Sequence, residues 1–357
     1  MRVPVLFLVV ACSALACEKN EPKQEEVKRS DTDAGLSKVE ALDPNLAEAV
    51  AAASVAVPDR GAPPPQVDGG PPPDGVFAPG AADKELPRGG MPKITLGNEG
   101  SAPKVQLGVA KAQALVSGTI QIAQQSDPRQ GAIPVLMTVT IEPKKLEAAG
   151  DAAKAPVAQP VALKVTGAKI DAPNVPKDVD LQIAKLRGSR VEYSILPGGA
   201  GAGFRFDAPK DAPSDLRDVV RSLSDAIALL TIPYPDKPLG AGAYFMVTSR
   251  DDFLGLDLVS YRLVKVKQVT ADVATLEVNT KRYAASRSFD FPGLPPEIEK
   301  NLVEFQATSE GTVELPVGAL LPTKGEVSSV LAAQLGRADV KQRAMLQLQT
   351  RTQLDLK

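Results

Sequence analysis

The chain lacks several side chains on which enzymes depend. Its 357 residues include no histidine, no tryptophan and only two cysteines. Without histidine there is no imidazole to act as general base or metal ligand, and every histidine-containing triad is excluded. Because the cysteines are Cys12 and Cys17, the rest of the sequence has no thiol nucleophile, disulfide or thiolate metal site. These absences predict a protein that is not an enzyme and holds no metal or cofactor.

The sequence also has no large excess of positive or negative charge, and aromatic residues are scarce. The net charge is -2 and the pI is near 5.6, so the sequence lacks the basic character of nucleic-acid-binding proteins and we expect no nucleic-acid partner. Aromatic residues make up 4% of the chain, and none lies between residues 94 and 192. That stretch must build its core from aliphatic side chains, in a chain long enough for one sizeable domain or two small ones.

The first 17 residues, MRVPVLFLVVACSALAC, have the layout of a targeting segment. Arg2 gives a positive start, and the apolar run at 3–10 is too short to span a bilayer. Small residues and a cysteine follow. The segment resembles the lipobox of bacterial lipoproteins, in which the signal peptide is cut just before a cysteine that receives lipid. The resemblance implies a chain anchored to the cell membrane or the outer membrane by its N-terminal lipid.

Two cysteines fit the cleavage site. The sequence VVAC, ending at Cys12, matches the usual residue order better, whereas ALAC, ending at Cys17, leaves a longer apolar segment and is followed at once by polar sequence. We favour Cys17 as the lipid attachment site and keep Cys12 as the alternative. Neither Ser13 nor Glu18 is the aspartate that retains many lipoproteins at the inner membrane. The resemblance therefore favours the outer membrane, with the domain in the periplasm or at the cell surface.

Residues 18–100 have the composition of a disordered Pro/Gly-rich tether. Charged and amide side chains dominate 18–33, and residues 58–92 contain 10 prolines and 7 glycines. Such a segment buries too little apolar surface to offset the entropy lost on ordering. A flexible chain of this length reaches roughly 50 Å, so we expect it to hold a folded domain, residues 101–357, away from the membrane.

Alternating apolar and polar residues predict strands in this domain, each with one buried and one solvated face, as is typical of antiparallel sheets. Residues Thr270-Ala271-Asp272 indicate a hairpin turn. The insert at 143–158 indicates a loop or a short surface helix. The expected strands are 113–124, 132–142, 160–170, 257–269, 273–282, 302–315 and 346–356.

One helix is predicted at about 214–230. Pro213 and Ser214 favour its start, Pro233 favours its end, and its apolar residues fall on one stripe. That stripe must pack on the sheet. The predicted fold class is therefore mostly β (α+β): a long antiparallel meander, as a curved sheet or half-barrel, packed on one main helix. The stripe consists of Leu216, Val219, Val220, Leu223, Ile227 and Leu230.

The segment after this helix, PYPDKPLGAGAY at 233–244, resembles a motif of uncharacterised lipoproteins of myxobacteria. In those proteins the motif likewise follows a helix and precedes a β-meander, and Tyr244 stands where they have tryptophan. The resemblance extends from about residue 186 to the C-terminus. It implies the fold and the location of the protein, and it implies no enzymatic activity.

Two short motifs have simpler structural interpretations. The glycine-rich segment 198–203 lies between two predicted strands, and a phosphate-binding loop would be followed by a helix, so a hairpin loop is favoured. Ser101 and Lys104 have the Ser-x-x-Lys spacing of penicillin-binding enzymes. The other elements of that active site are missing, which favours a chance match.

Two acidic pairs and one aromatic group remain as candidate sites. The pairs are Asp251-Asp252, for which we favour a turn between strands, and Glu297 with Glu299, for which we favour a short helix. Paired carboxylates can also perform acid–base chemistry or bind Ca²⁺. The aromatic group would line a pocket or, more simply, fill the core. It consists of Tyr244, Phe245, Phe253 and Tyr261.

Three functions are compatible with these observations. The favoured one is a non-catalytic binding or structural lipoprotein of the cell envelope, whose partners are the membrane, through the lipid, and an apolar ligand or envelope protein. The alternative is a carrier of lipid or another apolar ligand in a half-barrel, which needs an apolar pocket of several hundred Å³. The third is a carboxylate-based hydrolase.

Overall fold

The computed structural model describes most of the chain from residue 72 onward. Cys12, Cys17 and the rest of residues 1–71 lie outside the described residues. Within the described part, no helix is long and apolar enough to cross a membrane. The described ranges are 72–108, 115–126, 131–143, 158–196, 198–210, 222–223, 225–253, 256–289, 300–319, 321–336 and 344–357.

Strands dominate the described residues, and α2 and α3 are short helices. In chain order the elements are α2 (Ala81–Glu85), β1 (Lys93–Asn98), β2 (Ser101–Val105), β3 (Val116–Gln125), β4 (Ile133–Pro143), β5 (Gln159–Ile170), α3 (Lys177–Ala184), β6 (Arg190–Ile195), β7 (Gly201–Asp207), β8 (Leu239–Ala241), β9 (Tyr244–Phe253), β10 (Leu256–Val269), β11 (Val273–Ala284), β12 (Leu302–Pro316), β13 (Lys324–Leu335) and β14 (Ala344–Leu356).

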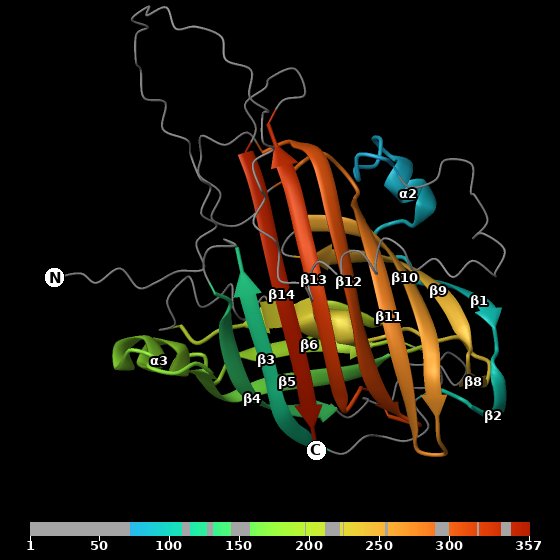
Figure 1. Ribbon diagram of the computed structural model, residues 1–357, viewed down its shortest axis with the longest axis horizontal. Coiled ribbons are helices and arrows are strands. Elements are labelled where there is room, and N and C mark those ends of the chain that lie inside the picture. Colours follow the sequence, from blue (N-terminus) through green and yellow to red (C-terminus); the bar gives the residue numbers. More distant parts are fainter. Residues whose placement is uncertain are drawn as a thin grey trace, which may run out of the picture. The chain divides into compact units, whose positions relative to one another are not determined.

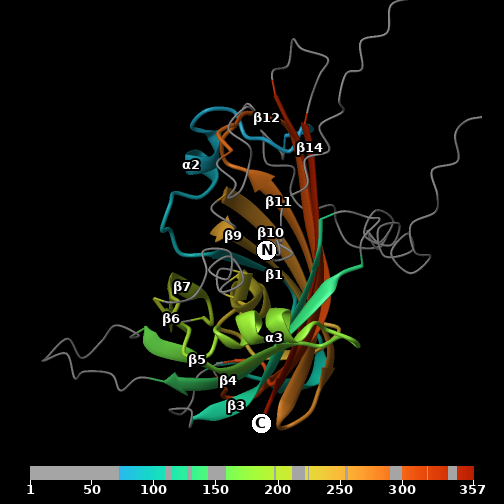
Figure 2. The same ribbon diagram turned by 90° about the vertical axis from the view of Figure 1, so that its left-hand side faces the viewer.

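Twelve strands form one antiparallel sheet in the order β1-β9-β10-β11-β12-β13-β14-β3-β4-β5-β6-β7 (Figure 1). Two meanders, β9 to β14 and β3 to β7, are joined where the C-terminal strand β14 pairs with β3. The sheet is open, with β1 and β7 at its edges. Figure 2 shows that β12 and β14 stand upright while β4 and β5 cross below them, so the sheet bends strongly along its width. The mostly-β, antiparallel prediction is confirmed.

One face of this sheet carries most of the core. From Phe305 to Leu315 in β12 and from Leu346 to Leu356 in β14 the buried side chains fall at alternate positions, as the alternation predicted, with Gly311 and Thr350 half-buried. We call the face that carries Phe305, Leu331 and Leu354 the inner face, and the opposite face the outer face. The predicted hairpin is also confirmed, since β10 pairs with β11 and Thr270 closes the turn by bonding Val273.

The predicted helix at 214–230 is only partly described. Residues 211–221 and 224 lie outside the described residues, so its start and its full stripe are not shown. Residues 222–223 and 225–230 are helical, and Leu223, Ile227 and Leu230 are buried. Leu230 lies against Gly325 of β13, which places this segment on the inner face.

The folded part includes residues that the sequence analysis assigned to the tether. β1 pairs with β9, and the peptide groups of Gly75 and Phe77 bond to Ala284 at the end of β11. The side chain of Phe77 is buried on the outer face, where it contacts Tyr283. The described part of the domain therefore starts at residue 72 rather than at 101. Composition alone concealed this because the segment has few apolar residues and many prolines.

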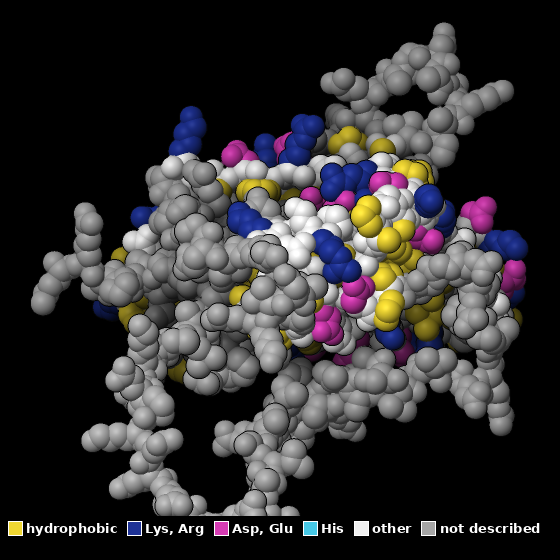
Figure 3. Space-filling model, turned by 90° about the horizontal axis from the view of Figure 1, so that it is seen from above, with side chains coloured by type: hydrophobic (Ala, Val, Ile, Leu, Met, Phe, Trp, Pro, Cys, Tyr) yellow, Lys and Arg dark blue, Asp and Glu magenta, His cyan; other side chains and the backbone are white. Residues whose placement is uncertain are grey.

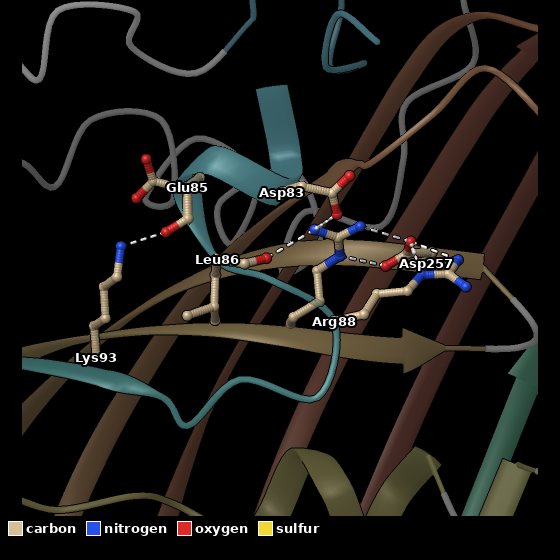
Figure 4. Close-up of polar contacts among 7 residues, drawn as sticks. Asp83, Glu85, Leu86, Arg88, Lys93 and Asp257 are labelled. Atoms are coloured by element: carbon tan, nitrogen blue, oxygen red, sulfur yellow. Dashed lines mark hydrogen bonds and ion pairs between the residues drawn. The ribbon is translucent and has the colours of Figure 1, made fainter. Parts of the chain in front are cut away.

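An ion-pair cluster on the outer face holds this N-terminal segment. Arg250 of β9 donates to both carboxylate oxygens of Asp257, at 2.5 and 2.8 Å, and to the carbonyl oxygen of Leu86 at 2.8 Å. Figure 4 shows Asp83, Leu86, Arg88 and Asp257 converging at this contact. Burial alone would raise the pKa of Asp257, but the bonds from Arg250 and Arg88 outweigh it and lower that pKa.

Candidate binding site on the inner face

Polar side chains occupy adjacent positions on the inner face of six neighbouring strands. The cross-strand register joins them in one line from β10 through β11, β12, β13 and β14 to β3. Directly paired residues of an antiparallel sheet point to the same face, so their side chains are neighbours. We call this line the polar row. It consists of Arg262, Thr280, Ser309, Ser329, Thr350 and Gln124.

A second polar line lies beside the row on three strands. Ser249 of β9 pairs with Ser260 of β10, and Ser260 pairs with Arg282 of β11. Ser260 precedes Arg262 by two residues, so the two lines share one face. The inner face therefore carries two arginines and several hydroxyls where a sheet with a simple apolar core would carry aliphatic side chains.

Most of these polar groups are buried, whereas Thr350 and Gln124, at one end of the row, are half-buried. Arg262 and Arg282 are only 4% and 5% exposed. The Nε of Arg262 and the hydroxyls of Ser260 and Thr280 have no hydrogen-bond partner within the described ranges. A buried polar group without a partner costs free energy, and native proteins leave few of them. The inner face thus offers hydrogen-bonding capacity that the described residues do not use.

The two arginines carry positive charge inside the domain. Burial lowers the pKa of Arg282 to about 10; the carboxylates of Asp251 and Asp225 oppose this shift and the charge of Arg262 adds to it. Burial also lowers the pKa of Arg262, against the effect of Asp251. Arginine begins from so high a pKa that both side chains remain protonated at neutral pH.

The helical residues 222–223 and 225–230, together with Thr231, contact the row. Gln124 donates to the hydroxyl of Ser222 at 3.0 Å, and Arg262 donates to the carbonyl oxygen of Thr231 at 2.8 Å. Thr231 follows the last helical residue, where backbone carbonyls lack intrahelical partners and the helix dipole favours a cation. The segment also brings the carboxylate of Asp225 into the electrostatic field of Arg282.

Apolar side chains of the same segment fill the space beside the row. Ile227 and Leu230 pack near Leu354 and Leu356 of β14, around a cavity of only about 10 Å³. That volume is too small for more than one water. A larger groove of about 470 Å³ lies mainly on the outer face, among polar residues that include Glu314, Lys324 and Asp355 of the neighbouring strands.

The acidic pairs do not form a shared site in the described residues. Asp251 and Asp252 lie within β9 rather than in a turn, so the turn interpretation is wrong. Strand alternation sends them to opposite faces: Asp251 accepts a hydrogen bond from Ser249 at 3.1 Å on the inner face, and Asp252 is exposed. Glu297 and Glu299 lie outside the described residues. No group of three or more acidic side chains placed to hold a metal ion occurs in the part of the chain that the structure describes.

The aromatic group is also divided between the faces. Phe245 is fully buried in the core, whereas Tyr244 is partly exposed. Tyr261 lies on the outer face, where its ring meets Tyr283 edge-on at 5.7 Å and burial raises its pKa to about 12. The side chain of Phe253 is outside the described residues. The core interpretation therefore holds for Phe245, and these residues do not line a common pocket.

The short motifs have structural roles. Ser101 donates to the carbonyl oxygen of Ala241 at 3.2 Å, and Lys104 pairs with Glu99 at 2.7 Å, so neither contacts the other. The glycine-rich segment 198–203 joins β6 to β7 in an antiparallel hairpin, as predicted. In the segment 233–244, β8 pairs with β2, and Gly240 leaves no room for a side chain against the Ser101 carbonyl.

Comparison with known proteins gives no family for this chain. No family model matches it, and no curated protein is similar to it at a significant level. The surface is equally unspecific: Figure 3 shows basic and acidic side chains interspersed on the face that it presents.

Proposed function

We propose that the chain is a membrane-anchored cell-envelope lipoprotein whose β domain is a non-catalytic binding module. In this proposal Cys17, or alternatively Cys12, carries the lipid, and the tether holds the domain in the periplasm or at the cell surface. The lipobox resemblance supports the anchor. The absence of histidine and of any cysteine after residue 17 supports a role other than catalysis.

The polar row is the observation that supports a binding role. A core built only for stability gains from apolar packing and loses from buried arginine and unpaired hydroxyl groups. The row places both on the inner face, in line across six strands. We take their retention to reflect contact with a bound partner, and the proposed anchor would place the domain in a compartment with lipids and envelope proteins.

Metabolic labelling tests the anchor. Cells that express the full chain are grown with radiolabelled palmitate, and we expect label on the wild type and on Cys12→Ala but not on Cys17→Ala. Loss of label only in Cys12→Ala would move the attachment site to Cys12. Label on none of the three proteins would overturn the lipoprotein proposal.

A carrier of an apolar ligand is the second candidate. The bent, open sheet with helical residues on its inner face supports it, because a half-barrel of this kind would have room for an acyl chain once those residues leave. The cavity of about 10 Å³ beside Ile227 means that the segment itself now fills the space. The carboxylate-based hydrolase gains no support, since Asp251 and Asp252 face opposite sides of β9.

A further inference from the structure

The segment 225–231 presents both polar and apolar groups to the inner face. At the polar row the carbonyl oxygen of Thr231 accepts a hydrogen bond from Arg262, and the carboxylate of Asp225 acts on the charge of Arg282. Beside the row it offers the apolar side chains of Ile227 and Leu230 to the sheet. An acidic head group joined to an acyl chain has the same two parts.

We infer that the inner face is a binding site for an anionic amphiphile, and that residues 225–231 occupy this site when no ligand is bound. The inference rests on the carrier proposed above and names its ligand. The head group, a carboxylate or phosphate, binds Arg262 and Arg282, because guanidinium groups form paired, charge-assisted hydrogen bonds with such oxygens. The acyl chain takes the place of Ile227 and Leu230.

The charges of the site favour an anion once the segment leaves. With Asp225 in place, two arginines face two carboxylates, Asp225 and Asp251. Without Asp225, one positive charge remains uncompensated on a buried surface. The unpaired Nε of Arg262 and the hydroxyls of Ser260 and Thr280 then provide donors for further oxygens of a head group. A neutral amphiphile would leave that one positive charge uncompensated, which is costly.

The apolar part of the site is present on the sheet. Val327, Leu354 and Leu356 lie on the inner face, two, four and six residues along their strands from the row, and all three are buried. A Cβ added at Gly325 would lie 2.7 Å from Leu230, so a chain that replaces Leu230 can lie close to the backbone here. Thr231, whose carbonyl oxygen accepts a hydrogen bond from Arg262, also lines the small cavity beside Leu354 and Leu356, so the segment joins the head-group site to this apolar wall.

Photocrosslinking tests the inference with the full chain in its membrane. Membranes are irradiated with a diazirine-bearing fatty acid, the matching fatty alcohol, or a phosphatidylglycerol with the same acyl chain. The labelled peptides are then identified by mass spectrometry. We expect an acid-headed probe to label peptides of β10 to β14 at least about tenfold more strongly than the alcohol, the ratio for one lost charged hydrogen bond. Whether the fatty acid or the phospholipid does so identifies the source of the head group.

Variants separate binding from folding. Arg262→Gln should lose about tenfold of this labelling, Arg262→Lys should retain part of it, and the matched control Arg351→Gln, on the exposed outer side of β14, should retain all. If Arg262→Gln does not fold, competition in the wild type replaces it: unlabelled oleate should suppress labelling and oleyl alcohol should not. Equal labelling by acid and alcohol, or labelling confined to the outer face, overturns the inference. The palmitate result is independent of both outcomes.

Discussion

Truncating Leu223 to alanine should destabilise the domain strongly. Leu223 is fully buried in the helical segment that covers the inner face. Removal of a buried leucine side chain loses its transfer free energy and leaves a cavity, together about 2–5 kcal/mol. A domain has only about 5–15 kcal/mol of stability in total. At about 2–4 °C per kcal/mol, the melting temperature should fall by roughly 4–20 °C.

Differential scanning calorimetry of the full chain measures this change, with Leu181→Ala as the matched control. Leu181 also lies in a helix, α3, but is 68% exposed, so its truncation should change stability by less than about 0.5 kcal/mol. Saturating oleate should reduce the effect of Leu223→Ala if the ligand displaces the segment. Equal, small effects of both truncations would refute the packing of this segment on the sheet.

Three further predictions concern the rest of the domain. Asp257→Asn should reduce the free energy of unfolding by about 1.5–3 kcal/mol at neutral pH, whereas Glu99→Gln, at an exposed ion pair, should reduce it little. The pKa of Asp257 is lowered in the folded state, so its stabilising contribution is present above about pH 4 and is lost as the pH falls through the folded pKa. Urea melts of wild type and Asp257→Asn should therefore converge below the folded pKa. Gly240→Ala should destabilise by about 1–3 kcal/mol or more because the new Cβ would lie 1.7 Å from the Ser101 carbonyl oxygen, whereas Gly131→Ala, with nothing within 4 Å, should fold normally in the same melts. Limited proteolysis should leave a fragment that begins at or before residue 72, and a stable fragment beginning near residue 100 would contradict the pairing of β1 with β9.

The sequence predicted the strands well because one buried face gives a period of two. Residues 302–315 and 346–356 alternate so regularly that side-chain orientation follows directly, and the structure has it so. Pairing between strands that are distant in the chain produces no such local pattern in the sequence. Nothing local in β14 specifies β3 as its neighbour, and nothing in β1 specifies β9.

The candidate site was missed for a related reason. In β10 the inner-face positions run Leu258, Ser260, Arg262, Val264 and Val266, so two polar residues interrupt an apolar series. Each interruption alone looks like an irregular strand. Only the register, which places Arg262 beside Thr280 and Ser260 beside Arg282, joins them to polar residues of the neighbouring strand in two lines. A search for polar residues at predicted inward positions of several strands would have found the candidates, though not their alignment.

Native mass spectrometry of the full-length protein, isolated from envelope membranes, tests the binding claim most directly. We expect the wild type to retain a non-covalent anionic amphiphile in addition to any covalent lipid. Arg262→Gln should lose this amphiphile and Arg351→Gln should keep it. If wild type and Arg262→Gln carry the same bound lipid, or if neither carries any, the inner face is not the proposed binding site.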